Sequence, residues 1–210
     1  MGRLFDYENA LFRFLSRMVD LLILNALTLA CCIPVVTIGA SVTAAHYTAL
    51  KLHRGESYVL KNYWKSFKEN LKQSTIIWIL FVAFFAIEYF TYITLTNGEA
   101  EYAMSMQGCI LATSVFGLCF MLWVFPLQSK FENRIGKTLR NAFIMTYKHI
   151  FRTVLMLAVF VLPFLMNIKW ILVLLSYGFS VPIYLSAIIY NKPFQKMERL
   201  VYESLEIERT

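Results

Sequence analysis

Three ionisable side chains fall inside apolar stretches of the sequence: Asp20, His46 and Glu88. Such groups are costly at membrane depth unless paired, and they often mark a proton or substrate path. Asp20 follows Arg17 by three residues, a helical spacing at which a local ion pair explains it. Glu88 lies about four turns into its stretch and would face a cavity or pair with His46. The plainer interpretation makes Glu88 a hydrogen-bonded or protonated structural residue and His46 a helix-packing residue.

No familiar catalytic or metal-binding pattern accompanies these residues. The sequence contains no GxSxG, P-loop or HExxH motif and no metal-ligand spacing. Its four cysteines all lie in apolar runs without a CxxC pair, which is typical of small membrane-buried side chains: Cys31, Cys32, Cys109 and Cys119. Catalysis requires a convergent acid, base or nucleophile. We therefore predict a non-enzymatic protein with no catalytic residue, no metal and no cofactor.

The composition indicates a membrane protein. Of the 210 residues, 59% are hydrophobic and 16% are charged, whereas about a quarter are charged in soluble domains. The net charge of +7 comes from basic residues between apolar segments, so membrane topology explains it better than nucleic-acid binding. The predicted fold is an all-α polytopic transmembrane bundle forming one domain over residues 1–210.

Five apolar stretches approach the ~20 residues that cross a ~30 Å hydrocarbon core. They are residues 18–34, 74–96, 102–127, 153–167 and 170–190. Ahead of them, residues 1–17 carry apolar side chains at helical spacing on one side and polar side chains on the other. That pattern predicts an amphipathic helix in the membrane interface.

Lysine and arginine decide whether residues 35–50 also cross, because these residues concentrate in cytoplasmic loops. Without that crossing, the best orientation places 16 of the 20 on the cytoplasmic side. With it, both termini are cytoplasmic and 19 of the 20 lie inside, Lys169 being the exception. We therefore predict six spans. A re-entrant segment over residues 35–52 is the alternative, because irregular backbone is tolerated where protein buries it.

Residues 35–50 are too polar to face lipid, yet Ser41, Ala45 and Ala49 lie four apart on one helix face. Small residues at this spacing let helices approach closely and let hydroxyls bond across the contact. Pro34 suits a first helical turn, and Gly39 allows close approach or bending. The predicted helix-packing motif is Pro34, Thr37, Gly39, Ser41, Ala45 and Ala49.

Two basic segments, 54–72 and 132–152, have apolar stripes at helical spacing and are predicted to lie in the cytoplasm. Such a stripe suits either anionic lipid or the cytoplasmic part of a partner protein. The residues predicted to form this surface are Lys61, Trp64, Lys65, Phe67, Lys68, Lys72, Phe143, Tyr147, Lys148 and Arg152. The two segments align at an offset of 80 residues, which suggests a weak internal repeat, 40–96 with 120–176.

The stretch "PVVTIGASVTAAHYTALKLHRGE", followed by "SFKENLKQSTIIWIL", resembles the YesL-like family of bacterial membrane proteins, a domain of unknown function. The matching residues are Pro34, Thr37, Ile38, Gly39, Ser41, Thr43, Ala44, Phe67, Asn70, Lys72 and Gln73. The resemblance provides no catalytic residues. It implies a multi-pass protein of the cytoplasmic membrane, in the genomic company of sugar-import ABC permeases and glycan-degrading enzymes of Gram-positive bacteria.

Two functions follow as expectations. The first is an accessory subunit associated with oligosaccharide ABC import, whose partners are the lipid bilayer and ABC permease subunits. The second is a secondary carrier or small-molecule-binding membrane protein that uses Glu88 and His46. Internal repeats are common in carriers, which gives the second expectation its support.

Overall fold

The computed structural model describes residues 2–56, 58–96, 103–131, 133–167 and 177–207. Across these residues every regular element is helical, which confirms the all-α prediction. The elements are α1 Gly2–Cys32, the 3₁₀ turn η1 Val35–Thr37, α2 Ile38–His53, α3 Val59–Thr96, α4 Ala103–Lys130, α5 Ile135–Lys148, α6 Ile150–Asn167 and α8 Ser180–Ile207.

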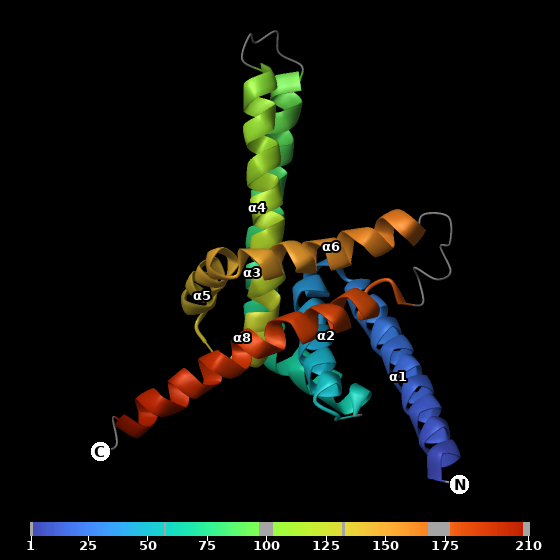
Figure 1. The fold of residues 1–210 in the computed structure, drawn as a ribbon. Coiled ribbons are helices and arrows are strands. Elements are labelled where there is room, and N and C mark those ends of the chain that lie inside the picture. The colour runs from blue at the N-terminus through green and yellow to red at the C-terminus, as the bar shows by residue number, and fades with distance from the viewer. Residues whose placement is uncertain (1, 57, 97–102, 132, 168–176, 208–210) are drawn as a thin grey trace.

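A long antiparallel hairpin of α3 and α4 dominates the structure (Figure 1). Helices α1 and α2 lie beside one end of this hairpin, and α6 and α8 run across it. The chain reverses at η1, so α2 runs back toward the end at which α1 begins. Four helix ends therefore lie together at one end of the hairpin, which we call the basic end. They are the start of α1, the end of α2, the start of α3 and the end of α4.

Helix α2 occupies the centre of the core. Eleven of its 16 residues are buried, and it contacts α1, α3, α4 and α8. Its small side chains make this possible: Ala40, Ala44, Ala45 and Ala49 have no exposed surface. At 1.5 Å per residue the helix is about 24 Å long, shorter than a ~30 Å hydrocarbon core. The predicted span over 35–50 is thus a short buried helix that returns the chain to the end at which α1 begins, and its crossing of the membrane stays a prediction.

Three described helical stretches are long and apolar enough to cross a membrane, Leu11–Cys32, Val59–Thr96 and Met106–Lys130. A fourth crossing arises if α5 and α6, which meet at a bend of 97°, are counted as one broken span. The described structure thus supports three or four candidate spans, and the predicted count of six is not confirmed. The predicted span 170–190 lies partly outside the described residues, and α8 continues beyond it into charged sequence.

Two predicted segment boundaries fall inside continuous helices. Helix α1 continues through residue 17 into the apolar stretch, so no separate interfacial helix ends there. Helix α3 likewise joins the predicted cytoplasmic segment 54–72 to the span 74–96 in one helix of 38 residues. Neither junction contains glycine or proline, the residues that interrupt helices. A change from basic to apolar residues alters the environment of a helix without ending it.

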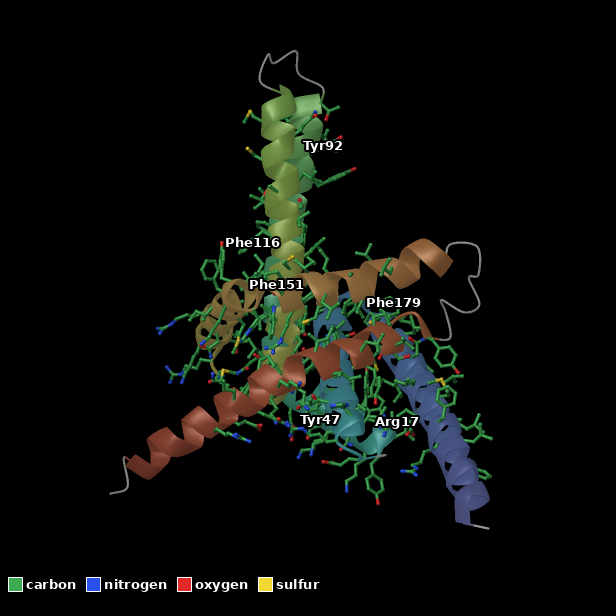
Figure 2. The ribbon with its side chains drawn as sticks, viewed as in Figure 1. Arg17, Tyr47, Tyr92, Phe116, Phe151 and Phe179 are labelled. Carbon is green, nitrogen blue, oxygen red and sulfur yellow. The ribbon has the colours of Figure 1, made fainter. Side chains whose placement is uncertain are left out.

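The basic half of α3 belongs to the core. The buried residues of α3 run from Val59 to Phe81, and none of its described residues beyond Phe81 is buried. Helix α2 packs along this half, while the rest of the hairpin projects beyond the core, as Tyr92 does in Figure 2. The segment 54–72 is therefore a packing partner of α2 as well as a basic surface.

Replacing Gly39 by alanine should separate α2 from α3. A Cβ at Gly39 would overlap the backbone oxygen of Ser74 and lie 2.7 Å from the Cβ of Trp78, so the helices must move apart. We expect the free energy of unfolding to fall by about 1–3 kcal/mol. Thermal unfolding in detergent measures this. Gly108→Ala is the control, because nothing lies within 4 Å of its Cβ position; equal stability of the two variants would contradict the close contact.

Candidate functional site

Hydroxyl groups on α2 bond to two neighbouring helices. The Ser41 hydroxyl donates to the Thr28 carbonyl of α1 over 2.9 Å and lies 2.8 Å from the Tyr63 hydroxyl of α3. The Thr43 hydroxyl lies 2.9 Å from that of Ser74, also on α3. All five residues are buried. Because each hydroxyl is satisfied across a helix contact, these bonds fix how α2 is rotated against α1 and α3.

The turn ahead of α2 is held by Thr37, whose hydroxyl donates to the carbonyls of Cys31 and Pro34 over 2.7 and 2.8 Å. Pro34 caps η1 and does not lie in the first turn of α2, which differs from the expectation. Ala45 and Ala49 are fully buried, on the same helix as Ser41. Every residue of the predicted packing motif thus lies in the turn or on α2.

His46 is buried and contacts α8. Its Nδ1 lies 3.3 Å from the Tyr190 hydroxyl, which also donates to the His46 carbonyl over 3.3 Å. Beside it lies an apolar cavity of about 390 Å³ with walls from α2, α4, α6 and α8, including Phe125, Phe160 and Ile183. The imidazole thus connects the centre of the core to α8.

Glu88 lies in the projecting half of the hairpin, away from His46. It accepts a hydrogen bond from the Ser114 hydroxyl of α4 over 2.5 Å. A cavity of about 330 Å³ surrounds it, lined by Tyr89, Tyr92 and Gln107 among others. Of the alternatives for Glu88, the structure shows the cavity and the hydrogen bond but not the pairing with His46, because the two side chains have different partners on different helices. The described structure therefore offers them no shared path for a substrate.

The closest contacts of Arg17 are with other helices, and no ion-pair contact within 4.0 Å joins it to Asp20 among the described side chains. The guanidinium of Arg17 donates to the Leu52 carbonyl at the end of α2 and lies 5.9 Å from the ring centroid of Tyr184 on α8. Arg17 therefore links three helices at the basic end, where Figure 2 labels it. Asp20 is half-buried on α1, one turn further along.

A buried amide junction at the basic end was not predicted. The amide nitrogen of Gln128 donates to the side-chain oxygens of Gln73 (2.6 Å) and Asn70 (3.3 Å), and its oxygen accepts from Thr138 over 3.1 Å. Gln128 is 3% exposed, so these bonds replace water. They join α3, α4 and α5. In the sequence, Asn70 and Gln73 stood out only because they belong to the residues that match the YesL-like family.

Glu198 of α8 completes the basic end. It forms ion pairs with Lys130 of α4 over 2.5 Å and with Arg54, just after α2, over 3.6 Å. Arg54 also donates to the Asn191 side chain over 3.3 Å. These groups are partly exposed, so each pair contributes little stability, but together they position α8 against the ends of α2 and α4.

The predicted partner or lipid surface is divided by the fold. On α3, Lys61, Lys65, Lys68 and Lys72 are exposed and Trp64 is 44% exposed. Phe67 is half-buried and stacks on the Tyr63 ring, so part of the apolar stripe faces α2.

On α5, Phe143 and Tyr147 pack against Phe116 of α4 with ring centroids 6.1 and 5.7 Å apart, yet both remain about half exposed. Lys148 is exposed and Arg152, on α6, is half-buried.

The described cysteines are free, and Cys109 is exposed on α4. Within the described part of the chain no three His, Cys, Asp or Glu side chains lie close enough to hold a metal ion. The chemistry that the geometry does provide is hydrogen bonding between helices and clustered positive charge.

Long apolar helices with exposed apolar side chains define the chain as a membrane protein. Residues 21–92 match the profile of a family described as protein of unknown function, DUF624. Over this segment the chain carries the domain found in YesL-like bacterial membrane proteins, which confirms the resemblance. No curated protein and no solved structure matches the chain. The matched segment contains α2 and nearly all of the α3 residues that pack against it.

Replacing Gln128 by methionine should loosen the amide junction. The substitution keeps the side-chain length but removes the donor to the side-chain oxygens of Asn70 and Gln73 and the acceptor of the buried Thr138 hydroxyl. An unsatisfied buried polar group costs about 1–3 kcal/mol, so the variant should unfold at lower temperature in detergent. Gln195→Met is the control, because Gln195 is exposed on α8. Equal melting temperatures for the two variants would show that the junction is unimportant.

Proposed function

We propose that the protein is a non-enzymatic accessory subunit associated with oligosaccharide ABC import, held in the bacterial cytoplasmic membrane. The observation that carries this proposal is the exposed face of α3. Four lysines and Trp64 are presented there by a helix whose opposite face packs on the central α2. An exposed tryptophan on a rigid helix can anchor a protein contact, and the surrounding lysines can attract an acidic partner surface.

The nature of the partner rests on the family. The YesL-like resemblance implies genomic company with sugar-import ABC permeases, which supports a permease subunit as the protein that meets this face. Such company is an association and not a physical contact. The sequence has no recognisable set of acid, base and nucleophile residues, which supports a role in assembly rather than in catalysis.

The orientation follows from the charges. We propose that the basic end faces the cytoplasm, with both chain termini on that side. Supporting this, the lysines of α3, together with Arg17, Arg54 and Lys130, gather toward the basic end, and positive residues are enriched on the cytoplasmic side of membranes. The number of crossings stays a prediction.

Lys61→Glu combined with Lys65→Glu should abolish co-purification of the partner. The reversed charges would repel the acidic partner surface that the lysines attract. The full chain is purified in mild detergent from its own cell, and ABC permease subunits are identified by mass spectrometry. The control is Lys137→Glu with Arg140→Glu, which makes the same charge change on exposed positions of α5. Recovery of the unaltered chain without any permease subunit, across several growth sugars, would overturn the proposal.

A single cysteine at position 65 tests the orientation. In a variant lacking the four native cysteines, Lys65→Cys should react with a membrane-impermeant maleimide in inverted vesicles and resist it in intact cells. The side chain is exposed on α3, so reactivity reports the side of the membrane and not burial. Labelling in intact cells alone would reverse the assigned orientation.

A further inference from the structure

The bend between α5 and α6 opens a cavity of about 470 Å³ against α8. Four cationic side chains line it: Lys148 at the end of α5, Arg152 early in α6, and Lys192 with Lys196 on α8. The two lysines of α8 are four residues apart and so share one face of that helix. The 97° bend brings the cations of α5 and α6 to the same cavity.

No carboxylate lines this cavity. Glu198, close by on α8, is already engaged by Lys130 and Arg54. Among the described side chains none of the four cations forms an ion pair, and Arg152 approaches only His149, with Nη1 and Nδ1 3.4 Å apart. Positive charges held together without a counter-charge repel one another, and a bound anion would convert this repulsion into attraction.

Apart from Asn141 and His149, the remaining residues of the cavity wall are apolar, and α6 carries exposed apolar side chains next to Arg152. Ile144 and Met197 contribute to the wall. On α6, next to Arg152, Phe151 is 90% exposed and Leu155 is 53% exposed. An anion that also carries hydrocarbon chains can use both surfaces, whereas a small soluble anion uses only the cations.

The cavity lies at the level where the α3–α4 hairpin becomes polar. The His149 ring beside it stacks on Trp123, with ring centroids 6.0 Å apart. Trp123 precedes Gln128 by five residues, which is about 8 Å along α4. Because Gln128 belongs to the amide junction that ends the apolar part of the hairpin, the cavity falls close to the headgroup layer, about 5–8 Å thick on each side of a bilayer.

We propose that this cavity binds the phosphate headgroup of an anionic phospholipid, with its acyl chains lying along the exposed apolar face of α6. Basic pockets between helices near the cytoplasmic surface are suited to such headgroups. Free phosphate esters share the headgroup chemistry but lack the chains. The site uses α5, α6 and α8, and is distinct from the α3 face assigned to a protein partner.

The test compares lipid retention by the full chain. Purified protein in phosphatidylcholine nanodiscs is titrated with phosphatidylglycerol, and bound lipid is counted by native mass spectrometry. Lys148→Gln with Lys196→Gln should weaken phosphatidylglycerol binding about thirtyfold, if each cation contributes a typical surface amount. Lys61→Gln with Lys65→Gln removes the same charge from α3 and should change binding less than about twofold. Lys148→Arg with Lys196→Arg should restore it.

Three results would overturn the assignment. One is equal retention of phosphatidylcholine and phosphatidylglycerol by the unaltered chain. Another is an equal loss in the α3 control, which would indicate diffuse surface charge. The third is full displacement by soluble glycerol phosphate at millimolar concentration, which would assign the cavity to a free anion. If the double variant fails to fold, Lys192→Gln, at an exposed position, should still weaken binding about fivefold.

Discussion

The close approach of α2 to α3 is the contact on which the remaining structure depends. At Gly39 the two helices are so close that a side chain on α2 would collide with the backbone oxygen of Ser74 on α3. The Thr43–Ser74 and Ser41–Tyr63 contacts then fix the rotation of α2. Because α2 also contacts α1, α4 and α8, a small shift of α2 would disturb its packing against each of these helices.

The sequence was informative where the cause of the structure is local. Small residues four apart in 35–50 predicted a helix that needs close neighbours, and α2 is buried throughout its length. Apolar runs predicted the long helices α1, α3 and α4. Helix ends were less predictable, because the charge pattern changes near residues 17 and 72 while nothing there interrupts hydrogen bonding along the backbone.

Contacts between distant segments could not be read from spacing. Gln128 bonds with Asn70, 58 residues away, and His46 with Tyr190, 144 residues away. Which polar side chains meet depends on how each helix is rotated and how far it slides along its neighbour, and both follow from the whole core. The bend at His149 is a similar case, because residues 137–162 contain no glycine or proline that would predict it. Tertiary packing overrides local helical preference there.

The fold places two cationic surfaces on different helices near the same end. The α3 face is backed by α2, whereas the cavity is built where α5 bends into α6 against α8. Since they share no side chain, a protein on the first surface leaves the second open to lipid. Glu198 joins α8 to the ends of α2 and α4. Anything that moves α8, such as an anion drawn to Lys192 and Lys196, therefore acts on the same core that supports the α3 face.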